Sequence, residues 1–214
     1  MIQLQSESAS YQGVETLHDI DLLVSKGEKI ALVGQSGSGK STLIKLIYDR
    51  YPINTALVPQ DYGLVNHLSV YHNVYIGCLG QYSTLYNLAN LIRPWPDQVK
   101  IVRAILVRLQ LDDYLFRPVG HLSGGQRQRV AVARSLFQKG CLLLADEPVS
   151  SVDEQQSKVV LKQLLSGFST TVLAMHDIQL ALAFCSRIIG LEKGRIVLDS
   201  PSEELTSKDL LTLY

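Results

Sequence analysis

The segment Gly34-Gln-Ser-Gly-Ser-Gly-Lys40-Ser41 places the strongest constraint on how this chain folds. It fits the pattern G-x-x-x-x-G-K-[ST], a loop whose backbone N–H groups surround phosphate groups. Such a loop requires a strand before it and a helix after it. Residues 30–33 form a continuous apolar run typical of a buried parallel strand, and residues 43–47 carry apolar side chains at helical spacing. The sequence therefore predicts a strand, a phosphate-binding loop and a helix, in that order.

Further apolar segments predict the rest of an α/β core. Ile20, Leu22 and Val24 alternate with Asp19 and Asp21, as in a half-buried strand. Three other short apolar runs are candidate core strands, and two more are joined through Lys193-Gly194 as a closing hairpin. These runs are residues 56–58, 141–145 and 170–175, followed by 188–191 and 195–198.

Between Asp61 and His121 the pattern becomes helical. Apolar residues recur at helical spacing from Val99 to Leu109, and Asp97, which follows Pro96, is the expected helix cap. No Gly-, Ser- or Pro-rich tether bounds this stretch. We therefore predict a single domain over residues 1–214, with a core at 1–60 and 122–214 and a helical subdomain at about 61–121.

Composition excludes several classes of protein. The 214 residues contain 20 Lys plus Arg and 20 Asp plus Glu, so no overall charge favours nucleic acid or an anionic membrane. The three cysteines have neither disulfide-framework nor metal-binding spacing and indicate buried thiols in a reducing compartment. The N-terminus lacks the pattern of an export signal, and no apolar run approaches the ~18 residues of a spanning helix. We expect a cytoplasmic chain with no nucleic-acid partner, and any membrane role would have to come through a partner.

Four further motifs follow the glycine-rich loop. They are Gln60, then Leu122-Ser-Gly-Gly-Gln126, then Leu143-Leu-Ala-Asp146-Glu147-Pro, then His176. The acidic pair ends an apolar strand, where open α/β sheets place their sites. Each motif alone also has a structural interpretation, as a solvated strand end, a helix cap or a histidine that donates a hydrogen bond. Their order along one chain favours a functional interpretation.

This series of motifs resembles the ATP-binding cassette (ABC) ATPases, over essentially the whole chain. The resemblance implies a P-loop NTPase of the ABC ATPase type, an α/β fold. Its parts are a RecA-like core with a mainly parallel sheet, an antiparallel β lobe and an inserted helical subdomain. It also implies hydrolysis of ATP with Mg²⁺ in a head-to-tail pair of subunits, so that each chain supplies half of each of two sites.

The resemblance assigns roles to particular residues. Glu147 would polarise the attacking water, His176 would contact the γ-phosphate, and Lys40 would reach the β- and γ-phosphates. Mg²⁺ would be held by Ser41, Gln60 and, through water, Asp146, and Gln60 would also act as a catalytic residue that touches the attacking water. The predicted ATP-binding residues are Tyr11, Gly34, Gln35, Ser36, Gly37, Ser38, Gly39, Lys40, Ser41 and Thr42. The predicted contacts to the ATP of the opposing subunit are Leu122, Ser123, Gly124, Gly125 and Gln126, and the D-loop is marked by Ser150 and Asp153.

The sequence departs from the family pattern mainly between Lys40 and Gln60. These residues are only 20 positions apart, whereas the family normally has a longer segment that includes a small hairpin. We therefore expect a reduced antiparallel lobe. The D-loop also has Ser151-Val152 where the family commonly has Ala-Leu. Tyr11, expected to stack on adenine, could equally be an ordinary surface or core tyrosine.

Within the family, several segments look most like phosphonate-type importers. They are residues 64–70, 73–77, 145–149 and 193–199, and the terminal Leu213-Tyr214. The implied partners are a second ATPase subunit (identical or a sibling), membrane permease subunits and, indirectly, a substrate-binding protein, at the inner face of the cytoplasmic membrane. Two alternatives stay open: a subunit for export or lipoprotein release, and a non-transport ABC ATPase that acts on DNA or ribosomes. The short insertion, without sustained heptads or a basic excess, disfavours the second.

Overall fold

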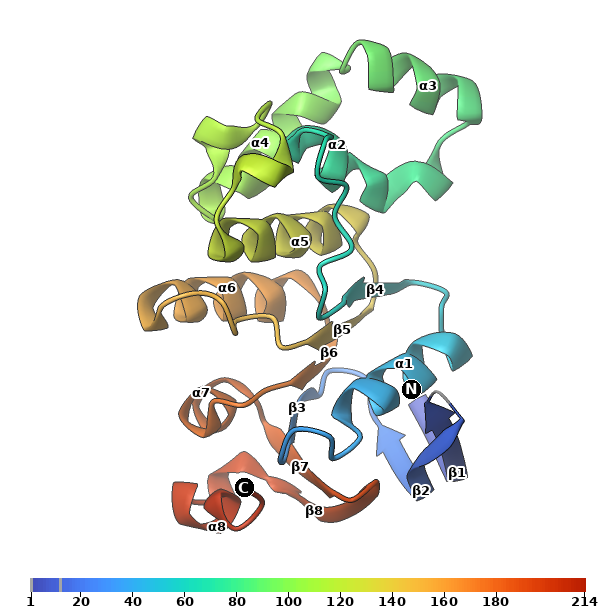
Figure 1. Ribbon diagram of the computed structural model, residues 1–214, viewed down its shortest axis with the longest axis vertical. Coiled ribbons are helices and arrows are strands. Elements are labelled where there is room, and N and C mark those ends of the chain that lie inside the picture. Colours follow the sequence, from blue (N-terminus) through green and yellow to red (C-terminus); the bar gives the residue numbers. More distant parts are fainter. Residues whose placement is uncertain (1, 12) are drawn as a thin grey trace. The chain divides into compact units, whose positions relative to one another are not determined.

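The computed structural model describes residues 2–11 and 13–214, except the side chain of Tyr11. Strands and helices alternate through most of the chain (Figure 1). The strands are β1 (Ile2–Tyr11), β2 (Val14–Val24), β3 (Lys29–Val33), β4 (Thr55–Val58), β5 (Leu142–Asp146), β6 (Thr170–Ala174), β7 (Arg187–Glu192) and β8 (Arg195–Pro201). The α-helices are α1 (Lys40–Arg50), α2 (Val70–Tyr75), α3 (Thr84–Ile92), α4 (Pro96–Arg108), α5 (Gly124–Gln138), α6 (Glu154–Gly167), α7 (Ile178–Phe184) and α8 (Ser207–Leu211).

A six-stranded sheet forms the centre of the α/β part of the chain. Its strand order is β4-β5-β6-β3-β7-β8, with every neighbouring pair parallel except the β7–β8 hairpin. The apolar runs predicted as strands are all present. Because the carboxyl ends of parallel strands meet at one edge of a sheet, the loops after β3, β5 and β6 come together there.

A second, two-stranded antiparallel sheet consists of β1 and β2. Four residues connect α1 to β4, because α1 ends at Arg50 and β4 begins at Thr55. This short link turns through Asn54 at φ +57°, and the Asn54 carbonyl accepts a hydrogen bond from the Cys141 amide at 2.9 Å. The predicted α/β fold with a reduced antiparallel lobe is therefore confirmed.

The main core lies between the two sheets and α1. Alternate residues of each strand share one face, so Ile30 and Leu32 of β3 enter this core. Leu43, Ile44 and Ile47 of α1 pack into the same cluster, which explains the helical spacing of these side chains. Burial of these apolar side chains fixes α1, and hence the loop that precedes it, against the sheet.

The contacts divide the chain into two compact units. An α/β unit contains Met1–Gln60, Gly140–Ser150 and Phe168–Tyr214, and a helical unit contains Asp61–Lys139 and Ser151–Gly167. Thus α5 and α6 pack with the helical unit, whereas the sequence analysis assigned everything after residue 121 to the core. Leu136 of α5 contacts α6 so closely that a side chain at Gly167 would lie 2.6 Å from it. The assignment of all 214 residues to one domain stays a prediction.

One detail of the helical unit corrects the sequence analysis. The residue that precedes the first turn of α4 is Trp95, and Pro96 is the first helical residue, so Asp97 lies inside the helix. Proline suits this first position because its fixed φ matches a helix and no N–H is required there. Asp97 therefore contributes a negative charge to the first turn instead of acting as the cap.

Candidate nucleotide-binding site

The glycine-rich loop joins β3 to α1, as the motif requires. Gly34 and Gly39 have φ values of +136° and +108°, which only glycine adopts without strain. A Cβ at Gly34 would lie 2.2 Å from the backbone oxygen of Leu191. The first-turn amides of α1 have no partners within the helix, and they begin at Lys40. The loop and helix start therefore form a cradle suited to an anion.

Lys40 is buried in this cradle, with 5% of its surface exposed. Its Nζ donates hydrogen bonds to the backbone oxygens of Gly34, at 2.6 Å, and Gln35, at 2.9 Å. Burial lowers the pKa of the Lys40 ammonium, while the carboxylates of Glu147 and Asp146 act in the opposite direction. The loop thus holds a cation beside two acidic side chains.

Asp146 ends β5 with 6% of its surface exposed. Burial raises the pKa of its carboxyl group, and a hydrogen bond with Ser41 partly opposes that shift. The Oδ1 atom is buried and has no hydrogen-bond partner among residues 2–11 and 13–214. A buried carboxylate oxygen left unpaired is costly, so this atom is suited to a ligand that carries positive charge or donates hydrogen bonds.

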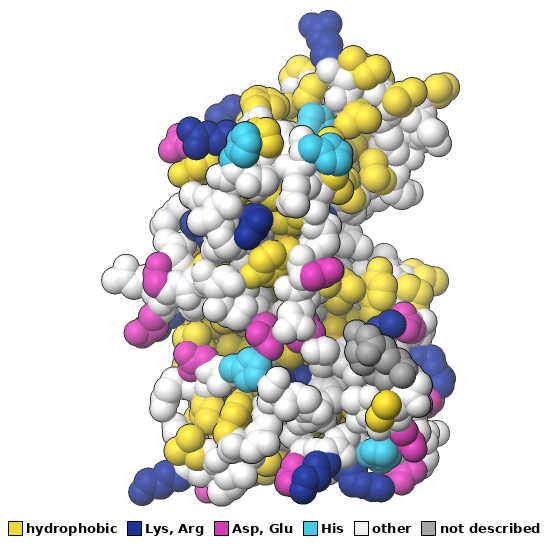
Figure 2. Space-filling model, viewed as in Figure 1, with side chains coloured by type: hydrophobic (Ala, Val, Ile, Leu, Met, Phe, Trp, Pro, Cys, Tyr) yellow, Lys and Arg dark blue, Asp and Glu magenta, His cyan; other side chains and the backbone are white. Residues whose placement is uncertain are grey.

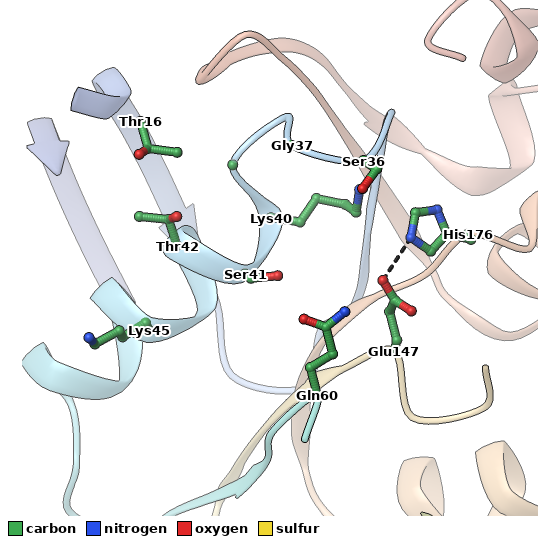
Figure 3. Close-up of a pocket in the computed structure, with 11 residues that line it drawn as sticks. Thr16, Ser36, Gly37, Lys40, Ser41, Thr42, Lys45, Gln60, Glu147 and His176 are labelled. Atoms are coloured by element: carbon green, nitrogen blue, oxygen red, sulfur yellow. Dashed lines mark hydrogen bonds and ion pairs between the residues drawn. The ribbon is translucent and has the colours of Figure 1, made fainter. Parts of the chain in front are cut away.

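Glu147 and His176 meet at the ends of β5 and β6. The Oε1 atom of Glu147 lies 2.7 Å from Nε2 of His176, as the dashed line in Figure 3 shows. Glu147 has a left-handed backbone with φ +52°, and its amide donates to the Ala174 oxygen at 3.1 Å. This turn directs the carboxylate toward the cavity instead of along the strand.

A cavity of about 420 Å³ joins the loop to these acidic and histidine side chains. Gln60, from the end of the segment after β4, points into the same space as Ser41 and Glu147 (Figure 3). The structure therefore brings together the predicted Ser36, Gly37, Gly39, Lys40, Ser41, Thr42, Gln60, Glu147 and His176 around one cavity. Thr16 of β2 and Lys45 of α1 also line it, and the sequence analysis did not select them.

The segment Leu122–Gln126 lies in the helical unit. Ser123 precedes α5, and its Oγ accepts a hydrogen bond from the Gln126 amide at 3.3 Å. The Gln126 side chain in turn accepts from the Ser123 amide at 2.9 Å, which completes a capping box. A Cβ at Gly125 would lie 2.7 Å from the Ser151 oxygen, so this position requires glycine. Capping is thus an observed role of Ser123, and contact with nucleotide stays a prediction.

The remaining predicted residues lie in different surroundings. Ser150 donates from its amide and hydroxyl to the Glu147 oxygen, at 3.3 and 3.2 Å. Asp153 accepts from the Gln156 amide at 2.9 Å, at the start of α6. Tyr11 was predicted to stack on adenine, and its side chain lies outside the described part of the structure.

No helix in the described part of the chain is both long and apolar enough to cross a membrane. No three His, Cys, Asp or Glu side chains among residues 2–11 and 13–214 come together as a possible metal site. The glycine-rich loop, the buried Lys40 and the carboxylates beyond it define a nucleotide-binding protein of the phosphate-loop class.

Comparison with known proteins identifies the family within this class to which the chain belongs. A family model described as ABC transporter matches residues 17–150. The phosphonates import ATP-binding protein PhnC of Pseudomonas entomophila is 36% identical over 242 residues, which cover 100% of this chain and 91% of that protein. The PhnC protein of Shouchella clausii is 34% identical over an alignment that covers 100% of this chain and 91% of that protein. A dimeric bacterial ABC transporter cassette superposes with a TM-score of 0.80 at 24% identity, covering 94% of this chain and 99% of that one.

The chain belongs to the ABC transporter family and is an ATPase of that family. The resemblance inferred from the motifs is therefore confirmed. The alignment with the Pseudomonas protein extends over 242 positions against 214 residues here, so that relative carries segments that this chain lacks. This difference agrees with the short link between α1 and β4.

Proposed function

We propose that this chain is the ATP-hydrolysing subunit of an importer of the phosphonate type. The observation that carries the proposal is the similarity, along the whole chain, to proteins named for phosphonates import. The cavity at the loop supports the chemistry, since it gathers a phosphate cradle, a buried lysine and an acid–histidine pair. In this account ATP closes a pair of chains and hydrolysis reopens them, and this movement operates a membrane permease.

In the proposed reaction, the loop amides and Lys40 bind the phosphates of ATP. Glu147 accepts a proton from the attacking water, and His176 contacts the γ-phosphate. In the structure these two side chains are bonded to each other at 2.7 Å. That bond has to lengthen or be shared before Glu147 can engage a water. His176 is therefore well placed to hold Glu147 until the nucleotide arrives.

Mg²⁺ fits the residues present. Among the described residues the Oδ1 atom of Asp146 is unpaired, the carboxyl group of Asp146 interacts with Ser41, and oxygen atoms are the ligands that Mg²⁺ prefers. Gln60 would add a third oxygen. Mg²⁺ commonly keeps several waters and uses one or two protein oxygens together with substrate phosphates, so a cluster of acidic residues is not needed. When bound, Mg²⁺ would neutralise charge that develops on the phosphate oxygens.

The helical unit offers a surface for the permease. A groove of about 330 Å³ is lined almost entirely by apolar atoms, among them Leu68, Tyr75, Leu79, Leu88 and Leu91. His72, Thr84 and Asn87 also line the groove but contribute little polar surface to it, so it suits an apolar helix and disfavours a charged ligand. We assign the groove to a cytoplasmic helix of the permease, since proteins that power import must contact a membrane subunit.

The orientation of α3 supports this assignment. Its leucines face outward, with Leu85 80% and Leu88 53% exposed, while Asn90 is fully buried. Asn90 Oδ1 accepts hydrogen bonds from the Tyr71 hydroxyl and the Trp95 amide, both at 2.8 Å. Because these bonds hold Asn90 on the inner side of α3, the leucines on the opposite side face outward and are accessible to a partner. Figure 2 shows hydrophobic side chains gathered over this end of the helical unit.

Capture from native membranes tests the proposed function. Tagged Glu147→Gln protein with ATP is expected to retain a membrane permease, identified by mass spectrometry after mild solubilisation. Leu88→Asp should lower permease recovery at least about tenfold, because it places a charge in the apolar groove. Leu211→Asp, at a position that is 61% exposed in α8, is the matched control and should have no effect.

Three results would count against parts of this account. Ribosomal or DNA-associated proteins without a permease would refute the transporter function and leave the ATPase chemistry intact. Undiminished capture by Leu88→Asp would show that the permease binds elsewhere. An export system among the partners would replace the import assignment.

A further inference from the structure

The last residues of the described chain lie against the phosphate loop. The Gln35 amide donates a hydrogen bond to the Leu213 oxygen at 3.2 Å, and the Gln35 side chain donates to the Tyr214 oxygen. Leu213 itself packs on β7, where a Cβ at Gly190 would lie 2.6 Å from its Cδ1 atom. Residues 213–214 are therefore fixed on the sheet and on the first turn of the loop.

Tyr214 also reaches the other side of the cavity. Its hydroxyl donates a hydrogen bond to the Met175 oxygen at 3.3 Å, directly before His176. Its ring lies edge-on to the His176 ring, with the centroids 6.4 Å apart at an interplanar angle of 62°. Burial raises the pKa of the Tyr214 hydroxyl, so it stays protonated and able to donate at neutral pH.

We propose that Tyr214 is a positioning residue for the ATPase site, acting through His176. The residue links two parts that have to keep a fixed separation during catalysis: the start of the phosphate loop at Gln35 and the turn that carries His176. The aromatic edge restricts the imidazole ring, and the hydroxyl restrains the backbone that precedes it. This inference rests on the proposed function, because it takes ATP hydrolysis as the output.

Tyr214 would affect catalysis by keeping the His176 ring in a fixed orientation. His176 is exposed, with 42% of its side chain accessible, so nearby protein atoms restrict its ring only partly. Within the described part of the chain, this ring has one bonded partner, Glu147, and one aromatic neighbour, Tyr214. Glu147 has to serve the attacking water during hydrolysis, which leaves Tyr214 as the neighbour that can hold the ring throughout the cycle. Small displacements of catalytic groups reduce rates strongly.

Steady-state kinetics of the full chain tests the proposal. Tyr214→Ala is expected to lower kcat about tenfold and to change KM for ATP by less than about threefold. Tyr214→Phe keeps the ring and should recover most of kcat. Leu211→Ala, in the same segment and 61% exposed, is the matched control and should behave as wild type. Unchanged kcat for Tyr214→Ala, or a loss that appears together with a large fall in melting temperature, would overturn the proposal.

A double substitution and an NMR spectrum test whether Tyr214 acts through His176. In a His176→Ala background, Tyr214→Ala should cause no additional loss of kcat, whereas a further tenfold loss would show that Tyr214 acts independently of His176. In NMR spectra of the nucleotide-free protein, Tyr214→Leu should shift the His176 ring signals and leave the other four of the five histidines unchanged. An unmoved His176 signal would refute the contact. Because this readout needs no ATP, it decides the inference even if the wild-type chain hydrolyses none.

Discussion

Replacing Glu147 with Gln is expected to lower ATP turnover about a thousandfold, because a positioned general base contributes ~10²–10⁴-fold. Glutamine keeps the shape of the side chain but cannot accept the proton of water. The left-handed backbone at this position, φ +52°, costs Gln as much as Glu, so the fold should be unaffected. The variant should still bind Mg-ATP and persist as a dimer, as measured by phosphate release and by light scattering with ATP.

A second acidic residue provides the control for this experiment. Glu203 is exposed and lies away from the cavity, so Glu203→Gln should retain the wild-type rate. Turnover of Glu147→Gln at the wild-type rate would remove Glu147 from its role as the base. A variant that neither hydrolyses nor binds ATP would instead indicate that Glu147 shapes the cavity.

Replacing Lys40 with Ala is expected to weaken ATP binding about a hundredfold, which corresponds to ~2.8 kcal/mol. Lys40 is the cation buried in the phosphate cradle, and its ammonium group has already lost most of its contact with water. Removing it relieves that cost but leaves the Gly34 and Gln35 oxygens without this donor and the two carboxylates without this cation, so the melting temperature should fall modestly. Titration with a fluorescent ATP analogue measures the affinity.

Lys26→Ala provides the comparison for the Lys40 variant. Lys26 is an exposed lysine in the turn before β3, and its removal should leave ATP affinity within about twofold. Equal losses for both variants would mean that overall charge, and not the cradle, governs binding. Full affinity in Lys40→Ala would contradict the assignment of the loop as the phosphate site.

The strands were predictable because each is a short run of apolar residues followed by a chemically distinctive loop. Residues 30–33 and 142–145 are covered on both faces, and such runs need no knowledge of distant contacts. The site was predictable for a related reason. Its residues follow strand ends, and parallel strands bring those ends to one edge of the sheet.

Features that depend on contacts between residues far apart in the chain were harder to predict from the sequence. The grouping of α5 and α6 with the helical unit follows from packing such as that of Leu136 beside Gly167, which no local pattern reveals. Thr16 lines the cavity only because β2 lies beside the loop, where a Cβ at Gly39 would be 2.7 Å from Leu17. Tyr214 was noticed in the sequence as part of a terminal resemblance, but its contact with His176 required the fold.

The outward leucines of α3 illustrate a different difficulty. Helical spacing alone predicts that the apolar face of a helix is buried. Here Asn87 and Asn90 supply the inner face, where their Oδ1 atoms accept hydrogen bonds from the hydroxyls of Tyr75 and Tyr71, both at 2.8 Å. A network of polar side chains therefore reversed the expected orientation, and only the three-dimensional contacts of these residues show it.

The most direct test of the central claim, that two chains share each ATPase site, is to mix two inactive variants. Ser123→Arg alters the start of α5, the half-site that would contact the ATP of the opposing chain. Lys40→Ala alters the phosphate cradle, which is the other half of the site. Neither should hydrolyse ATP alone. An equal mixture should regain about a quarter of the wild-type rate, since half of the dimers are mixed and each of these has one intact site. No recovery, with mixed dimers demonstrated by native mass spectrometry, would contradict the shared site.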